Sequence, residues 1–342
     1  MARTVGRTAS RPIHMIVGTL AAILTLAATS GCGLLGSKSA ADNNSSGRVE
    51  KSTIKIGVIP VIDDAPVFIA QKRGYFKQEG LDVELKTIQG GAAGITGLIS
   101  GDLDFTFGNW VSFFAAEAKG AAKAVDGIKL VADGYQGKND MFLVMASADS
   151  PVKGPKDLAG KTIGVNTFKN IAELAVRATL QANGVDPASV TFKEFPFPDM
   201  TAALTNKQVD AAFMVEPFIT QAERTAGAIP AVDTMSGPIA DLPIAGYGTS
   251  GKVASADPKT VAAFQRALAR GQQDAAQRSV VEELLPEYAK IDKETAGLVH
   301  FGVYPTSLDA TRLTRVTTLM RSYGMLDRQV DVQPMLVAGS GG

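Results

Sequence analysis

The body of the chain carries the same order of short segments twice, and this repetition limits the possible fold more than any other feature. The segments TIKIGVIP (53–60), DVELKTI (82–88) and LDFTFGN (103–109) read as strands, and amphipathic stretches separate them. The same order returns in KTIGVN (161–166), VTFKEF (190–195) and VDAAFMV (209–215). Strands that alternate with helices are typical of a parallel sheet with helices on both faces. The sequence therefore predicts an α/β protein of two lobes, each containing a mostly parallel sheet flanked by helices.

Matching residues recur at an offset of 106 or 107 positions. The aligned pairs are Leu98 and Leu204, Asp104 and Asp210, Phe107 and Phe213, and the Ile-Gly-Val runs at 56–58 and 163–165. The alignment also pairs Trp110 with Glu216, because each directly follows the third strand of its unit. In open α/β sheets, ligands bind outside the carboxyl ends of the strands. We therefore expect the loops after the strands to face one cleft between the lobes.

The chain is expected to cross between the lobes twice, at MFLVMASADSP (141–151) and at LPIAGYGTSGKVAS (242–255). Lobe 1 is then discontinuous, comprising residues 52–145 and 246–342, and lobe 2 comprises residues 146–245. Asp257 and Pro258 are typical of a helix start. Gly324 is typical of the residue that follows a helix end. We assign both C-terminal helices to lobe 1.

The N-terminal segment has the composition of an export signal. Three arginines precede the apolar run MIVGTLAAILTLAA (15–28), which is shorter than the roughly 20 residues of a membrane-spanning helix. The following TSGC resembles the bacterial lipobox, which predicts that residues 1–31 are removed and Cys32 is lipidated. Thr29 stands where that motif usually has leucine, and an ordinary secretory signal is the alternative. Residues 32–51, rich in Gly, Ser, Ala and Asn, are predicted to form a flexible tether.

Three segments resemble the signatures of solute-binding proteins for nitrate, sulfonates, taurine and thiamine-type pyrimidines. These segments are APVFIAQKRGYFKQEGLDVEL (65–85), LISGDLDFTFGN (98–109) and VDAAFMVEPF (209–218). The resemblance spans residues 52–323 and implies a two-lobed periplasmic-binding-protein fold with the ligand between the lobes. It implies a protein that delivers a small solute to the permease of an ABC importer by hinge closure. Together with the lipidation predicted at Cys32, this leads us to expect a monomer anchored to the outer face of the cell membrane.

The loops predicted to face the cleft contain the candidate ligand-binding residues. These are Asp63, Asp64, Gly91, Asn109, Trp110, Asn166, Thr167, Asp199 and Glu216.

Several candidates also have structural interpretations. Glu216 either accepts a hydrogen bond from the ligand or lies at the start of a helix that Pro217 opens. Trp110 is either a stacking wall for the ligand or a core residue. Asp64 and Asp199 are expected to cap helices, and so is Asn170. Tyr247 belongs either to the hinge or to the pocket, and either Phe195 or Phe197 is expected to line it.

The predicted cleft contains more acids than bases, with Lys169 as its one basic residue. A strongly anionic ligand usually requires positive charge, so the loops favour a neutral, zwitterionic or amine-bearing solute, such as an aminopyrimidine or taurine. Helix N-termini leave a sulfonate possible. With 34 basic and 34 acidic residues in the chain, no nucleic-acid partner is expected.

Catalysis is the first alternative, because a pyrimidine-synthesising enzyme shares the fold that the resemblance implies. His300 is the only histidine outside the predicted signal peptide, and we expect it to be structural and distant from the cleft. No metal-binding, nucleophilic or phosphate-binding motif is present, and no cofactor is expected. A structural or adhesive lipoprotein is the second alternative.

Overall fold

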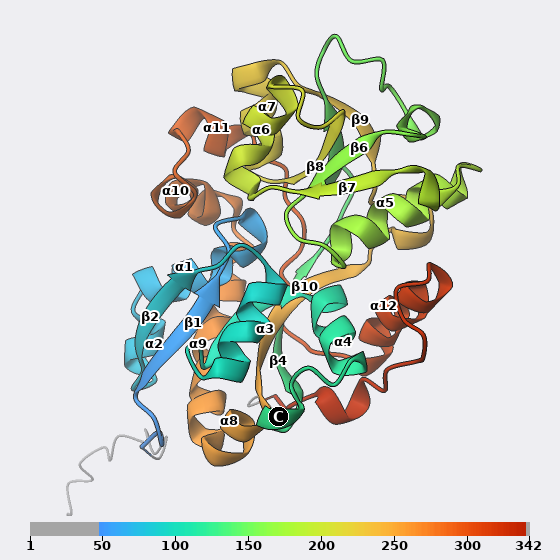
Figure 1. The fold of residues 1–342 in the computed structure, drawn as a ribbon. Helices are drawn as coiled ribbons and strands as arrows, with labels where there is room; N and C mark the ends of the chain where they lie inside the picture. Colours follow the sequence, from blue (N-terminus) through green and yellow to red (C-terminus); the bar gives the residue numbers. More distant parts are fainter. Residues whose placement is uncertain (1–47, 340–342) are drawn as a thin grey trace, which may run out of the picture. The chain divides into compact units, whose positions relative to one another are not determined.

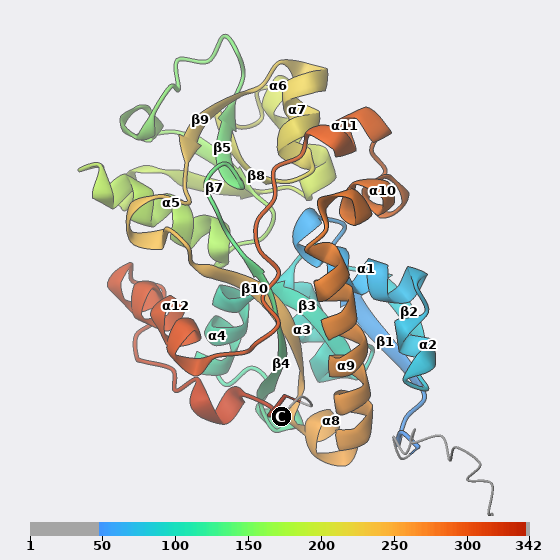
Figure 2. The same cartoon turned by 180° about the vertical axis from the view of Figure 1, so that it is seen from behind.

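The computed structural model describes residues 48–339, which belong to one compact unit beginning at Ser46 (Figures 1 and 2). The predicted signal peptide, Cys32 and most of the predicted tether lie outside the described residues. Between residues 48 and 339, no helix is both long and apolar enough to cross a membrane.

The strands of residues 48–339 form two mixed sheets of five strands each. The first has the order β2-β1-β3-β10-β4 and the second β7-β6-β8-β5-β9. In each sheet one strand, β10 or β5, runs antiparallel to both neighbours. The prediction of two lobes with mostly parallel sheets is confirmed. The bounds in the first sheet are β1 (Thr53–Val58), β2 (Asp82–Thr87), β3 (Phe105–Asn109), β4 (Ile128–Gln136) and β10 (Pro243–Ser250), and in the second β5 (Phe142–Ala146), β6 (Thr162–Val165), β7 (Thr191–Glu194), β8 (Ala211–Val215) and β9 (Ile229–Asp233).

The strand register repeats the duplication seen in the sequence. In the first sheet Ile56 pairs with Phe105, and in the second Ile163 pairs with Ala211. These pairs are related by offsets of 107 and 106 residues, the same values that align the two sequence halves. The central strands β3 and β8 therefore occupy equivalent positions in the two sheets.

The crossings between the sheets fall a few residues before the expected positions. Strand β5 lies wholly in the second sheet and β10 wholly in the first. The chain thus leaves the first sheet between residues 136 and 142 and returns to it between residues 233 and 243. The expected boundaries at 145/146 and 245/246 run through β5 and β10, because each sheet takes its antiparallel strand from the crossing segment itself.

Helices cover both sheets, and the C-terminal helices bridge them. Helix α9 packs on α1 and β4, and α12 packs on α4 and β10, whereas α11 contacts α7 beside the second sheet. Gly324 follows α12 in the left-handed region at φ 70°, as expected for a residue after a helix end. The bounds are α1 (Ala65–Lys72), α2 (Tyr75–Gln78), α3 (Gly91–Ser100), α4 (Trp110–Ala118), α5 (Ile171–Ala182), α6 (Met200–Thr205), α7 (Phe218–Ala226), α8 (Gly251–Ala256), α9 (Pro258–Ala275), α10 (Arg278–Ala289), α11 (Lys293–Leu298) and α12 (Ala310–Ser322), with short 3-10 turns η1 (Ile62–Asp64), η2 (Lys123–Val125), η3 (Pro155–Leu158), η4 (Pro187–Ser189), η5 (Phe197–Asp199), η6 (Gly237–Ile239) and η7 (Gln333–Met335).

The packing of α9 on α1 requires a glycine at the contact. A Cβ atom built on Gly271 would lie 2.2 Å from the backbone oxygen of Pro66. The two helices approach so closely at this point that backbone, rather than a movable side chain, occupies the space. Close helix packing therefore fixes η1, the turn that precedes α1, against the rest of lobe 1.

We expect Gly271→Ala to lower the free energy of unfolding by about 1–3 kcal/mol, because overpacking forces the two helices apart. Gly297→Ala is the matched control, since Gly297 is also helical and a Cβ there meets nothing within 4 Å. That variant should be neutral or more stable by up to about 1 kcal/mol. Urea unfolding measures both, and equal stability of Gly271→Ala and the wild type would contradict the packing described.

Candidate functional site

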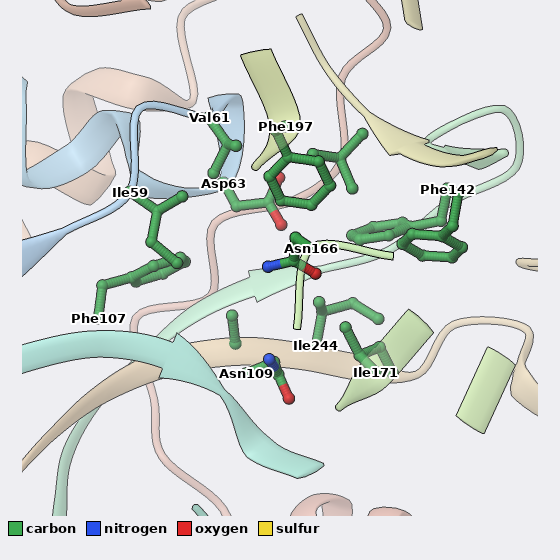
Figure 3. A pocket seen from close by; sticks show the side chains of 13 residues that line it. Ile59, Val61, Asp63, Phe107, Asn109, Phe142, Asn166, Ile171, Phe197 and Ile244 are labelled. Carbon is green, nitrogen blue, oxygen red and sulfur yellow. The ribbon is translucent and has the colours of Figure 1, made fainter. Parts of the chain in front are cut away.

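A small cavity lies between the two sheets, at the carboxyl ends of β1, β3, β6 and β8 (Figure 3). Its volume is about 30 Å³. Both lobes contribute to its wall, as expected for ligands that bind beyond the ends of parallel strands. The lining residues are Ile59, Val61, Asp63, Phe107, Asn109, Ile244 and Ala245 from the first lobe and Phe142, Asn166, Ile171, Phe197, Phe213 and Val215 from the second.

Three of the predicted site residues, Asp63, Asn109 and Asn166, line this cavity, and they are the polar side chains among its lining residues. The remaining ten lining residues are apolar, four of them phenylalanine. This composition resembles small-molecule sites, which are mostly apolar and carry a few placed polar groups.

Asp63 lies in η1 with 5% of its surface exposed, and its Oδ1 atom has no hydrogen-bond partner. Burial, together with repulsion from Glu216, raises the pKa of its carboxyl to about 7. A buried acceptor without a partner is destabilising by about 1–3 kcal/mol. Such a group is rare in proteins and favours a functional role for Asp63.

The two asparagines present their amide N–H groups to the cavity. Asn109 is the N-cap of α4, and its Oδ1 accepts the N–H of Ser112 at 2.9 Å. Figure 3 shows the amide nitrogen of Asn109 on the side of Asn166. The Oδ1 of Asn166 accepts a hydrogen bond from Asn170 at 2.7 Å, and its Nδ2 has only a long contact of 3.4 Å with the backbone oxygen of Gln89. Because both amide oxygens are occupied, both side chains act as donors toward a ligand.

Asp64 fixes the loop that carries Asp63. Its Oδ2 accepts the N–H of Ile59 at 2.9 Å, and its Oδ1 accepts the Tyr247 hydroxyl at 2.5 Å. Burial raises the pKa of this carboxyl well above its ordinary value. The prediction that Asp64 caps α1 was wrong, because the side chain bonds to β10 and to the end of β1 instead. Tyr247 is accordingly a buried anchor in lobe 1 and does not line the cavity.

Glu216 has no exposed surface, and both of its carboxyl oxygens have partners. Oε2 accepts the N–H of Thr220 at 3.2 Å, and Oε1 accepts the Thr220 hydroxyl at 2.8 Å. Oε1 also accepts the backbone N–H of His300 at 3.1 Å and lies 2.9 Å from its Nδ1. Glu216 does not line the cavity, and α7 begins at Phe218, one residue later than predicted.

His300 contacts Glu216 directly, so the expectation that it is distant from the predicted cleft loops was wrong. Its backbone and ring both bond to the carboxyl group that ends the central strand of lobe 2. The hydrogen bond to Glu216 raises the pKa of the His300 imidazole. This contact joins residues 84 positions apart in the chain, and no local sequence pattern indicates it.

The other predicted site residues lie around the cavity without lining it. Trp110 has no exposed surface, and its ring packs on Gly246, where a Cβ atom would lie 2.2 Å away. Gly91 packs against Ser112 of its own lobe, and Thr167 packs against Gly90 across the cleft. Asp199 is exposed at the N-cap of α6 without a side-chain capping bond, so the predicted cap was wrong there too.

Phe107, Phe142 and Phe213 were missed by sequence reasoning, whereas either Phe195 or Phe197 was expected to line the pocket and Phe197 does. The three missed residues lie within strands that read as continuous core. Alternation along a strand could have found two of them, because residues two positions apart share a face. Phe107 shares a face with Asn109, and Phe213 shares one with Val215.

Comparison with known proteins gives one family match. Residues 62–279 match the family described as NMT1/THI5 like. The riboflavin-binding protein RibY of Chloroflexus aurantiacus is 25% identical over 323 residues, covering 85% of this chain and 86% of RibY.

Solved structures share the fold. The alkanesulfonate-binding protein SsuA of Xanthomonas axonopodis pv. citri, bound to MOPS, superposes with a TM-score of 0.72 at 15% identity, covering 84% of this chain and 99% of SsuA. The desulfurization enzyme DszB superposes with a TM-score of 0.60 at 16% identity, covering 85% of this chain and 97% of DszB. The fold of this chain is thus the periplasmic-binding-protein fold, which occurs in binding proteins and in at least one enzyme.

We expect Asp63→Asn to raise the free energy of unfolding more at pH 8 than at pH 5. The folded-state pKa is raised from 3.8 to about 7, so the native state binds this proton more tightly and the wild type loses stability as pH rises from about 4 to about 7. One pKa unit corresponds to about 1.36 kcal/mol. The difference in free energy of unfolding between Asp63→Asn and the wild type should therefore be about 2–3 kcal/mol larger at pH 8 than at pH 5. Urea unfolding at both pH values measures this gap.

Asp199→Asn is the matched control, because it removes an exposed carboxyl and should give nearly the same gap at both pH values. A pH-independent gap for Asp63→Asn would show that Asp63 is not buried as described.

Proposed function

Because the chain belongs to the NMT1/THI5-like family, we propose that it is an extracytoplasmic solute-binding protein. In this proposal it captures a small organic solute between its lobes and delivers it to an ABC importer. The observation that carries the proposal is the interlobe cavity with the unpartnered Asp63 carboxyl in its wall. A buried polar group without a protein partner, in a cavity lined from two lobes, is what a solute-binding site requires.

The contacts across the cleft support binding by closure. The N–H of Ile62 donates to the backbone oxygen of Glu216 at 3.0 Å, and the Gln89 side chain donates to the backbone oxygen of Asn166 at 3.0 Å. The cavity of about 30 Å³ is far smaller than the roughly 300–1,000 Å³ of a small-molecule site. Access of a solute therefore requires these interlobe contacts to open, and binding proteins of this architecture close around ligands by hinge motion.

The cavity favours a neutral solute with an aromatic or apolar body. Its lining residues include no lysine, arginine or histidine, so a nitrate or a sulfonate would meet no positive side chain. A bound anion would also lie beside the Asp63 carboxyl and repel its charged form, which burial already disfavours. RibY is described as riboflavin-binding, and a flavin has the neutral, flat, mostly apolar ring that these walls suit.

The lipid anchor remains part of the proposal and rests on the sequence alone. Lipidation at Cys32, followed by a flexible tether over residues 32–51, would hold the two lobes beside a permease at the outer face of the membrane. A solute-binding protein needs this proximity where no enclosed compartment retains it.

The enzymatic alternative has less support from the site. DszB shows that the fold can carry catalysis, but the lining residues of this cavity include no serine, cysteine, histidine or lysine to act as nucleophile or base. Asp63 is the one ionisable group of the lining. A structural or adhesive lipoprotein would need no buried, unpartnered carboxyl in a cleft.

We expect a solute of the right class to stabilise residues 48–342 against heat. A ligand at 100 times its Kd adds roughly 2.7 kcal/mol of stability. The panel contains riboflavin, an aminopyrimidine, taurine, hexanesulfonate and nitrate. Phe197→Ala should abolish the thermal shift, because Phe197 lines the cavity.

Phe195→Ala is the matched control for this experiment, because Phe195 is a neighbouring phenylalanine that does not line the cavity. It should keep the shift. If no member of the panel changes the melting temperature of the wild type, the proposed solute-binding function is contradicted for these solute classes.

A further inference from the structure

We infer that the solute presents to this cavity the polar edge of a flat, uncharged ring in which a ring N–H lies beside carbonyl oxygens, as in a lactam or a cyclic imide. The inference rests on the proposed solute-binding function and specifies its ligand class. The juxtaposition that carries it is an acceptor atom without a partner, Oδ1 of Asp63, on the same side of one apolar cavity as Asn166, with Asn109 beyond Asn166 as a second amide donor.

The acceptor side of this arrangement is the Asp63 carboxyl. Oδ1 of Asp63 is buried and has no hydrogen bond from the protein. Figure 3 shows the Asp63 carboxyl directed toward Asn166. A ring N–H group of a ligand satisfies this atom.

The donor side consists of two amide groups whose oxygens are already occupied. The oxygen of Asn109 is bonded to the N–H of Ser112, and the oxygen of Asn166 to the side chain of Asn170. The nitrogen of Asn166 makes only the long contact with Gln89, so both amide groups can donate to carbonyl oxygens of a ligand.

Cationic and anionic solutes each leave one kind of polar group in the cavity without a hydrogen-bond partner. An ammonium group offers only donors, so it would satisfy Asp63 and oppose both amide N–H groups. A sulfonate or nitrate offers only acceptors, so it would satisfy the amides but leave the ionised Asp63 carboxyl unpaired and repel its charge. A buried polar group without a partner discriminates strongly against such ligands. A lactam or imide edge satisfies both kinds of group without carrying charge.

The apolar walls indicate that this edge belongs to an aromatic ring system. Phe107, Phe142, Phe197 and Phe213 line the cavity, and aromatic faces stack favourably on flat rings. A second, apolar hollow of about 190 Å³ shares Ile59 and Phe197 with the cavity and includes Ile88, Pro198 and Phe218. It provides space for an apolar extension of the ring, so a fused system suits the site better than a single small ring.

Riboflavin and 3-methylriboflavin test the inference directly, because the two differ only by a methyl group on the imide nitrogen. Binding is measured by quenching of flavin fluorescence with the wild type, with Asp63→Ala and with the control Asp199→Ala. We expect the wild type and Asp199→Ala to bind riboflavin at least tenfold more tightly than 3-methylriboflavin. In Asp63→Ala this preference should disappear, because the acceptor of the imide hydrogen has been removed.

The outcomes separate the inference from the proposed function. Equal affinity of the wild type for the two flavins would overturn the inference. Thermal stabilisation by an aminopyrimidine, taurine or hexanesulfonate, with no binding of riboflavin, would also overturn it and leave the solute-binding function intact. Absence of binding by every probe would contradict the proposed function itself.

Discussion

The Glu216 carboxyl at the end of β8 is the contact on which the interlobe arrangement depends. A fully buried carboxyl is tolerated only when hydrogen bonds satisfy it, and here they come from two separate parts of the chain. Thr220 in α7 and His300 in the segment before α12 both bond to it. Its backbone oxygen accepts the N–H of Ile62, the first residue of η1, which carries Asp63. The residue that ends the central strand of lobe 2 therefore also positions the loop of lobe 1 that bears the unpartnered carboxyl.

The duplication explains which side chains reach the cavity. Phe107 and Asn109 in β3 correspond to Phe213 and Val215 in β8, and all four line it. The next residue along in each lobe does not line the cavity, because Trp110 packs on Gly246 and Glu216 bonds to Thr220 and His300. The two lobes thus place equivalent strand positions at the cavity, but lobe 1 contributes the amide donor of Asn109 where lobe 2 contributes the apolar side chain of Val215.

Sequence reasoning could predict the fold because its signals are local and periodic. Alternating strands and helices and the glycine after α12 depend on neighbouring residues, and the repeat is visible as the same local pattern occurring twice. The site could be predicted only in part. Asp63, Asn109 and Asn166 follow from their loops, whereas Asp64, Glu216 and His300 are determined by partners far away in the chain. The sequence left Trp110 open as either a stacking wall or a core residue, and the structure places it in the core against Gly246.

The central claim is that the two lobes close around a bound solute, and the amide of Ile62 reports on it most directly. Its N–H bonds to Glu216 across the cleft and can exchange with solvent only when the lobes separate at this point. Hydrogen exchange at Ile62 should therefore become markedly slower when the protein is saturated with a solute that raises its melting temperature. Exchange at Ile62 that is unchanged by saturation would contradict closure of the lobes around the ligand.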